Sequence, residues 1–318
     1  MPARQKIVDH AVAAALEQFA PLNLRADELA VTLVTPVFPL SSLKGGEGRG
    51  EEADHSQIKI PPPQPAPRLG GERESESKCA HHRGDANIYP ASVVKLFYLA
   101  AAHRQMADGK ISDTPELRRA LHDMIVHSGN EATGYVLDVL TGTTSGPELP
   151  PAELNAWHEQ RNAVNRHFHS LGYTGINANR KTWHDGPYGR DQQAVEQFTP
   201  ARNSLTTNAT ARLLAEIFSG QCVSAGRSAQ MLALLKRDFT DPARTDHQAC
   251  EFIGAGLPAA AKLWSKAGYM SQARHDAALV ELADGAMFAL VIFTTRPGEK
   301  EIIPAITRKI IAGLTTEN

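Results

Sequence analysis

The pattern of apolar and polar residues alternates along this chain between a helical period and a strand-like one. Apolar residues recur at helical spacing in seven stretches, at residues 4–20, 114–126, 131–140, 152–171, 207–218, 228–239 and 302–314. Strand-like runs occur at residues 28–34, 261–269, 277–282 and 286–294, and Asp284-Gly285 predicts a hairpin turn between the last two. Residues 173–202 are polar and contain several glycines, which is typical of a long loop.

This order of elements predicts a mixed α/β (α+β) fold, with an antiparallel sheet flanked by the terminal helices plus an all-helical subdomain. We expect residues 1–40 and 220–318 to form the sheet lobe and residues 88–219 to form the helical lobe. Residues 41–87 are rich in Gly, Pro, Glu and Arg. Such a segment cannot bury enough apolar surface to offset its ordering entropy, so we predict a polar, mostly mobile insertion.

Composition narrows the classes of function. The chain has 318 residues and a formal net charge of −2, which gives no basic surface for nucleic acid. It has three widely spaced cysteines, and no apolar run reaches the roughly 20 residues that a transmembrane helix needs. The N-terminal stretch is amphipathic and does not have the pattern of a signal peptide. A cytoplasmic location is therefore expected, or a periplasmic or secreted one if a leader has been removed.

The most informative stretch is Tyr89-Pro90-Ala91-Ser92-Val93-Val94-Lys95, where a polar segment gives way to an apolar one. Proline is favoured at a helix start, so a helix is expected to open near Ser92. Lys95 would then lie one turn along on the same face. Apolar neighbours favour the neutral form of a lysine amine, which makes Lys95 a candidate base for a Ser92 nucleophile.

A single Ser-x-x-Lys match has little specificity, because Ser41 to Lys44 and Ser75 to Lys78 also match in polar surroundings. Two downstream elements add weight to Ser92. Ser128-Gly129-Asn130 interrupts two helical stretches, and Lys266-Ala267-Gly268 lies on a predicted strand near the C-terminus. Taken alone, the first is an ordinary helix-breaking turn and the second a solvated strand charge.

In this order and context, the three elements resemble the signature of class A β-lactamases and penicillin-binding proteins. The resemblance covers roughly residues 88–318 and implies the fold of that superfamily. It implies that Ser92 attacks an acyl carbonyl, that Lys95 accepts its proton, and that the backbone N–H groups of Ser92 and Tyr269 form the oxyanion hole. Ser128 would relay a proton to the leaving nitrogen, Asn130 would fix Lys95 and the substrate amide, and Lys266 would attract a substrate carboxylate.

The chain departs from that family at several positions. Gly129 stands where the family has Asp, and Ala267 stands where it has Thr or Ser. Class A β-lactamases also carry a Glu-x-x-Leu-Asn run whose Glu activates the deacylating water, and the loop at residues 179–191 lacks such a run. His184 and Asp185 in this loop are candidate substitutes for that base.

We therefore expect a serine hydrolase that forms a covalent acyl-serine from an amide or ester, with weak β-lactam hydrolysis at most. The substrate would be a small-molecule or peptide-like acyl compound. A D,D-peptidase, an esterase or a transacylase with the same site remains open, as does a non-catalytic penicillin-binding or ligand-sensing module. No nucleotide cofactor is expected, because no Gly-rich phosphate loop follows a strand, and scattered histidines without zinc-ligand spacing predict no metal.

Overall fold

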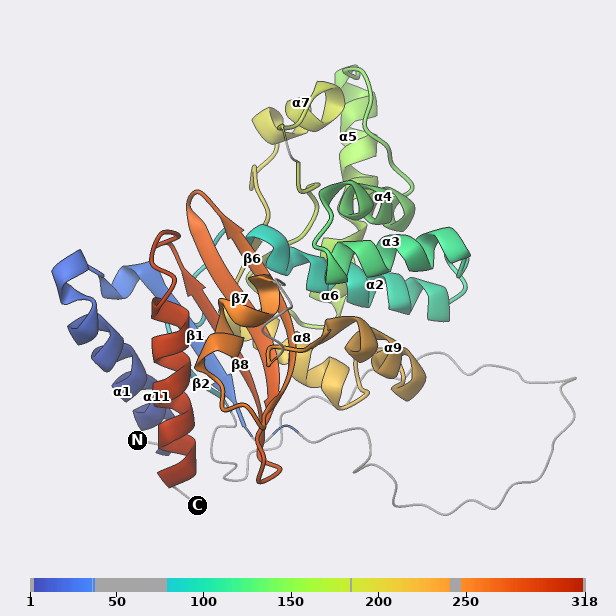
Figure 1. Cartoon of the computed structure of the whole chain (residues 1–318). Coiled ribbons are helices and arrows are strands. Elements are labelled where there is room, and N and C mark those ends of the chain that lie inside the picture. Colours follow the sequence, from blue (N-terminus) through green and yellow to red (C-terminus); the bar gives the residue numbers. More distant parts are fainter. Residues whose placement is uncertain (1–2, 36, 38–78, 184, 241–246, 317–318) are drawn as a thin grey trace, which may run out of the picture.

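A six-stranded antiparallel sheet in the order β2-β1-β8-β7-β6-β5 divides the molecule (Figure 1). The computed structural model describes residues 3–35, 37, 79–183, 185–240 and 247–316. The strands of this sheet are β1 (Leu29–Val34), β2 (Cys79–His82), β5 (Lys236–Arg237), β6 (Lys262–Met270), β7 (Ala273–Glu281) and β8 (Met287–Thr294). Two further strands, β3 (Ile176–Asn177) and β4 (Ser204–Leu205), pair apart from it.

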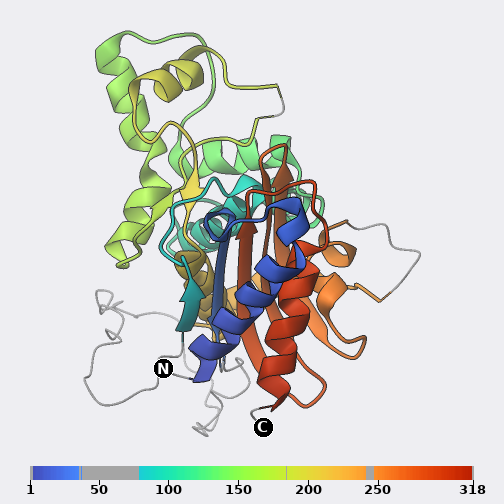
Figure 2. The same ribbon diagram turned by 90° about the vertical axis from the view of Figure 1, so that its left-hand side faces the viewer.

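The first and last helices, α1 (Ala3–Gln18) and α11 (Ile302–Thr316), lie side by side on one face of the sheet (Figure 2). Alternation along β8 explains how the sheet is covered on both sides. Leu290 and Ile292 belong to the core under the terminal helices, whereas Val291 and Phe293 belong to the core on the opposite face. A strand buried on both faces needs this continuous apolar run, which is what the sequence shows.

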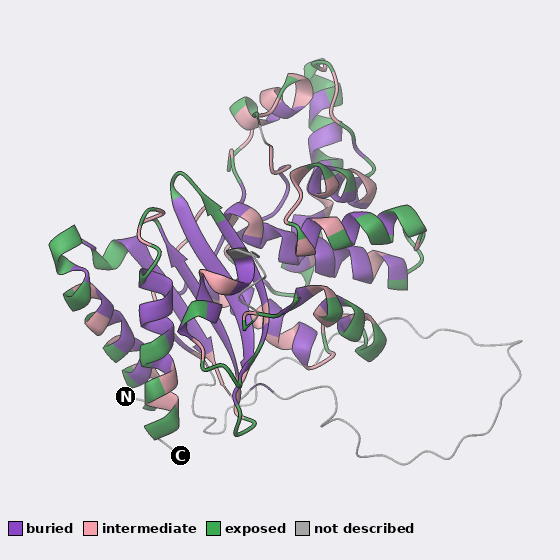
Figure 3. Cartoon of the chain, in the orientation of Figure 1, coloured by how far each residue is buried: buried purple, intermediate pink, exposed green. Residues whose placement is uncertain are grey.

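The opposite face carries α8 (Thr207–Phe218) and, beyond it, a helical lobe built around α2 (Lys95–Ala107). Residues 96–103 of α2 are all buried, so this helix is enclosed by its neighbours (Figure 3). The other helices on this side are α3 (Pro115–Val126), α4 (Asn130–Thr141), α5 (Pro151–Arg161), α6 (Ala163–Ser170), α7 (Gly189–Gln197), α9 (Ala225–Leu235) and α10 (His247–Cys250).

The predicted fold class is confirmed, and individual elements differ from expectation. The helix predicted over residues 152–171 is two helices, α5 and α6, which meet at Asn162. The polar stretch at residues 173–202 contains α7, and α8 packs on the sheet although its residues were placed in the helical lobe. Residues 79–82 form the edge strand β2 inside the range expected to be an insertion, while residues 41–78 lie outside the described residues.

No helix in the described part of the chain is both long and apolar enough to cross a bilayer.

Candidate active site

Ser92 lies in a short 3-10 turn, η4 (Ala91–Val94), and α2 begins at Lys95. The sequence placed Ser92 at the start of the helix itself, so the structure moves it one turn earlier. The turn is closed by the backbone N–H of Lys95, which donates to the carbonyl oxygen of Ser92. Ala91, directly before Ser92, has a φ of +46°, a conformation that costs a residue with a Cβ atom about 1–2 kcal/mol. The surrounding packing therefore has to hold this turn in place.

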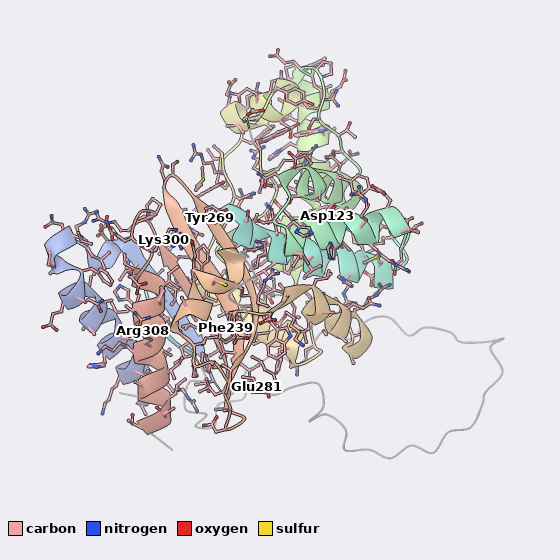
Figure 4. All side chains as sticks on the ribbon, in the orientation of Figure 1. Asp123, Phe239, Tyr269, Glu281, Lys300 and Arg308 are labelled. Atoms are coloured by element: carbon pink, nitrogen blue, oxygen red, sulfur yellow. The ribbon has the colours of Figure 1, made fainter. Side chains whose placement is uncertain are left out.

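Strand β6 supplies much of that packing at Gly268. A Cβ atom at this position would lie 2.7 Å from the carbonyl oxygen of Pro90 and 2.8 Å from the backbone nitrogen of Ser92. Only glycine permits the strand to run this close to the turn. The next residue, Tyr269, therefore has its backbone beside Ser92, and its side chain is exposed near one end of the sheet (Figure 4).

His275, on β7, binds the backbone of the segment that leads into the same turn. Its Nδ1 atom accepts a hydrogen bond of 3.1 Å from the backbone N–H of Thr294, so the ring proton is on Nε2. Nε2 then donates to the carbonyl oxygen of Tyr89 over 2.9 Å. Complete burial lowers the pKa of His275 to about 4, which keeps the ring neutral and this arrangement fixed at ordinary pH.

Lys95 is buried and points to the turn that precedes α4. Its Nζ donates to the carbonyl oxygen of Ser128 over 2.6 Å and to the side-chain carbonyl of Asn130 over 2.9 Å, and it lies 3.2 Å from the Ser128 hydroxyl. Among the described side-chain contacts, none joins Nζ to the hydroxyl of Ser92. The structure therefore brings three of the predicted site residues together directly, and places Ser92 next to them through the backbone.

Burial lowers the pKa of Lys95 to about 7, against an opposing effect of the Glu131 charge. The hydrogen bonds are compatible with the neutral amine. Two of the three neighbours are carbonyl oxygens that only accept, and they match the two N–H groups of a neutral amine. The third is the Ser128 hydroxyl, which can donate to the remaining lone pair. Lys95 is thus placed to exchange protons near neutral pH.

Ser128 lies between two lysines. Its backbone has a φ of +57°, and its hydroxyl, which lies 3.2 Å from Lys95 Nζ, accepts a hydrogen bond of 3.0 Å from Lys266 Nζ. Lys266 is completely buried and also donates to the side-chain oxygen of Gln248 and, over 2.7 Å, to the carbonyl oxygen of Ala267. These acceptors direct the Lys266 charge at Ser128. From the family resemblance we expected the Lys266 charge to face a substrate carboxylate, whereas the Lys266 side chain is fully buried in the structure.

A buried acid lies near Lys266 on β7. Asp276 accepts hydrogen bonds from the backbone N–H groups of Ile253 and Ala277, over 3.1 and 2.9 Å. Burial raises its pKa to about 7, while the two backbone bonds and the positive charges of Lys266 and Arg237 act in the opposite direction. The acid is part of the structure beneath the site and lies away from the solvent.

A cavity of about 620 Å³ adjoins Asn130 and opens beside the site. Among the residues that line it are Asn130, Glu131, Asp138, Lys181, Thr182 and Asp185. Lys181 Nζ is bound by Asp138 over 2.6 Å and by the Ser145 hydroxyl over 2.8 Å. Asp185 is exposed at the wall of this cavity, and His184 lies outside the described residues.

Sequence patterns did not identify every group around the site. Gln248 binds Lys266, and its side-chain nitrogen donates to the carbonyl oxygen of Val126 over 3.0 Å. Glu131 acts on the Lys95 charge from the first turn of α4. Gln248 belongs to no motif and gave no signal, whereas Glu131 directly follows Asn130 and could have been noticed.

The antiparallel sheet packed between terminal helices and a helical lobe is the architecture of the β-lactamase-like fold. A sequence profile of the β-lactamase enzyme family matches residues 112–314, which is more than half of the chain. The chain belongs to the β-lactamase enzyme family. The matched range includes Ser128, Asn130 and Lys266, and it begins after Ser92 and Lys95.

Solved structures with the same fold extend over nearly the whole chain. A β-lactamase from Sphaerobacter thermophilus has a TM-score of 0.61 at 18% identity, over 96% of this chain and 97% of that chain. A class A β-lactamase representative from Bacteroides cellulosilyticus gives 0.60 at 14% identity, over 98% and 99%. PBP-A gives 0.58 at 16% identity, over 95% and 96%. These identities establish a shared fold. Comparison with curated proteins gives no match.

Proposed function

We propose that this protein is a serine acyl hydrolase that opens amides or esters, including β-lactams, through a covalent acyl group on Ser92. The observation that carries the proposal is the position of the Ser128 hydroxyl between two buried lysine amines, 3.2 Å from Lys95 and 3.0 Å from Lys266. Burying two amines is costly, and a pocket that only bound a ligand would gain nothing from a hydroxyl placed between them.

In the acylation step, the oxygen of Ser92 forms a bond to the substrate carbonyl carbon, and its proton passes to the neutral Lys95 amine. The negative charge that develops on the carbonyl oxygen is stabilised by the backbone N–H groups of Ser92 and Tyr269. The close contact of Gly268 with the Ser92 backbone supports this pairing, because it places the two segments side by side.

The tetrahedral intermediate then collapses, and the bond from carbon to the leaving nitrogen or oxygen breaks. Ser128 gives its proton to the leaving atom and takes one from Lys95, which returns the amine to its neutral form. The positive charge of Lys266 lowers the cost of negative charge on Ser128 during this relay. Asn130 holds Lys95 in line over 2.9 Å.

Deacylation requires a water molecule and a base, and this half of the cycle has weaker support. Asp185 is the candidate base in the described part of the loop at residues 179–191, and it is exposed. An exposed carboxylate without supporting hydrogen bonds is a poorly positioned base. We therefore propose that acylation is efficient and release is slow, so that an amine or peptide nucleophile can compete with water, as in a transacylase or D,D-peptidase.

The test is to incubate the purified protein with a fluorescent penicillin and a chromogenic cephalosporin, following mass and turnover together. Wild type should gain the mass of one opened penicillin on Ser92, with slow turnover. Ser92→Ala should lose labelling completely, as expected when a nucleophile is removed. Ser75→Ala is the matched control, because Ser75 also lies three residues before a lysine.

Two results would contradict the proposal. One is labelling that survives in Ser92→Ala, which would place the nucleophile elsewhere. The other is the absence of any adduct or turnover with β-lactams and with a panel of esters and amides, which would indicate a non-catalytic module. If the adduct forms, adding a primary amine should accelerate its release when acyl transfer is the natural reaction.

A further inference from the structure

The end of α3 gathers three metal-binding side chains on the surface. One ligand atom from each of His122, Asp123 and His127 lies within 4.8 Å of the others, and this is the only such group of three in the part of the chain that the structure describes. We propose that this cluster binds a divalent transition-metal ion of the zinc type. The proposal is independent of the function proposed for Ser92, because none of the three residues belongs to the candidate active site.

The ligand set suits such an ion. Two imidazoles and one carboxylate are typical donors for Zn²⁺ and its neighbours, and a fourth position is left for water. Ligands about 2.0–2.1 Å from a tetrahedral ion lie about 3.3 Å from one another. His122 Nδ1 and Asp123 Oδ1 are already 3.3 Å apart. The ligand atoms all lie within 4.8 Å of one another, so the His127 ring has to approach the other two by up to about 1.5 Å to complete the set.

This movement is sterically cheap. The side chains of His122 and Asp123 are 49% and 32% exposed, and His127 is also exposed at the C-terminal cap of α3. The rings of His122 and His127 already lie 5.3 Å apart between centroids, at an angle of 67°. No core contact has to be broken when these rings turn toward a shared ion. Figure 4 marks Asp123 on α3.

The neighbouring charges leave one carboxylate oxygen for the ion. Arg119 binds the other oxygen of Asp123, Oδ2, over 2.9 Å, and is itself paired with Glu116 over 2.6 Å. Asp123 Oδ1 faces His122 and not Arg119. Arg119 would thus orient the carboxylate from behind, as groups outside the ligand set commonly do, while Glu116 offsets its positive charge.

The position of the cluster gives a bound ion a way to affect the candidate active site. His127 directly precedes Ser128, and the backbone N–H of Gly129 donates to the carbonyl oxygen of Asp123 over 2.9 Å. An ion held by Asp123 and His127 would therefore clamp both ends of the segment that leads to Ser128. We infer that metal binding restricts the motion of this turn.

The experiment is a calorimetric titration of the full chain, with any affinity tag removed, using Zn²⁺ alone. A second titration with Co²⁺ records the visible absorption of a bound ion. Wild type should bind one ion, and His127→Gln should weaken binding about tenfold or more, the order of loss that disturbing a metal site produces. Asp123→Asn should weaken it as well, and circular dichroism should show that both variants remain folded.

His10→Gln is the matched control, because His10 is an exposed helical histidine that, like His122, has an aspartate beside it in sequence, Asp9, but belongs to no metal-ligand group of three among the described residues. Its affinity should equal that of wild type. The proposal is overturned if wild type binds no ion, or if His127→Gln and Asp123→Asn bind as tightly as wild type. These readouts do not involve activity, so they remain informative if the acyl-serine proposal fails.

Discussion

The two sides of the candidate site differ in how firmly their side chains are held. On one side, which we call the floor, η4, the Ser128 turn and β6 are joined by short contacts and buried hydrogen bonds. On the other side, the loop at residues 179–191 bounds the cavity beside Asn130. Its residue Lys181 is tied to Asp138, and its acid Asp185 is exposed. The floor fixes the groups that we propose for acylation. The one buried carboxylate among the described residues of the loop, Asp191, lies 3.7 Å from the Arg161 guanidinium and is not among the residues that line the cavity.

If the proposed acyl-serine mechanism holds, this difference means that the groups for acylation are fixed by the fold while the group for deacylation is not. The groups proposed for acylation come from η4, the first residue of α2, the Ser128 turn and β6, which contact one another. Deacylation would depend on a base near the loop. The acid Asp138, which also lines the cavity, is ion-paired with Lys181 of the loop and is therefore not a free base. A protein with this arrangement should acylate well and release its product slowly.

The largest effect on the rate of covalent labelling is expected from Gly268→Ala, which disturbs the contact between β6 and the Ser92 turn. The added Cβ atom would lie 2.7–2.9 Å from three backbone atoms around Ser92, so the turn or the strand has to shift. A displacement of this kind typically costs about a hundredfold in rate. The measurement is the rate of covalent labelling by a fluorescent penicillin at saturating concentration.

Gly298→Ala serves as the control, because a Cβ atom at Gly298 meets nothing within 4 Å. Thermal denaturation of both variants separates a misplaced Ser92 from general unfolding. A Gly268→Ala protein that labels at the wild-type rate would show that β6 does not set the position of the nucleophile.

The next largest effect is expected from pH, and it tests whether Lys95 acts as a neutral base. With a pKa of about 7, Lys95 is mostly protonated at pH 6 and mostly neutral at pH 8. Because the neutral form accepts the proton of Ser92, the labelling rate should be about tenfold higher at pH 8 than at pH 6 and level off above it. The measurement is the labelling rate at saturating probe over this range.

Lys95→Arg is the control for this profile, since arginine stays charged throughout and should label slowly at every pH. Asp276 has a pKa near the same value, so an unchanged profile in Lys95→Arg would assign the titration to Asp276 and contradict the role of Lys95.

The smallest effect is expected on the loop side. Thr182 lines the cavity that contains Asn130, and its buried hydroxyl has no hydrogen-bond partner among the described residues. Thr182→Glu places a carboxylate there and should speed release of the penicillin adduct by only a few-fold, because the new base lacks supporting contacts. Thr182→Gln provides the same size without the charge. Equal release rates in the two variants would show that this position does not reach the acyl group.

Much of the fold was predictable because it depends on periodicity. The strand β8 is a long apolar run, and Gly285 adopts the positive φ of the predicted hairpin turn. β7 begins at Ala273, before the predicted strand at residues 277–282, because its first half carries Arg274, His275 and Asp276. The break between α5 and α6 was not predictable in this way. The Asn162 side chain there accepts a hydrogen bond from Asn165 in the next helix and another from Asn179, which is 17 residues further along the chain, so this break depends partly on a distant partner. Helix α7 was missed because only Asp191 and Ala194 are buried along it.

In the candidate site too, features set by local sequence could be predicted and features set by distant contacts could not. Ser92, Lys95, Ser128 and Lys266 could be selected from ordered motifs, and the structure gathers them. The contribution of Gln248 could not be found, because it comes from its approach to Lys266 in three dimensions. The sequence also could not reveal that Lys266 is enclosed, since burial of a charged strand residue is decided by the elements that cover it.

The positive φ of Ala91 has a consequence for any attempt to engineer this protein. Replacing Ala91 with glycine removes the steric penalty and should raise the free energy of unfolding by about 1 kcal/mol. The same change loosens the peptide that aims Ser92, so labelling should slow while the melting temperature rises. A selection based on heat resistance alone would then favour this variant and gradually remove the activity it was meant to preserve.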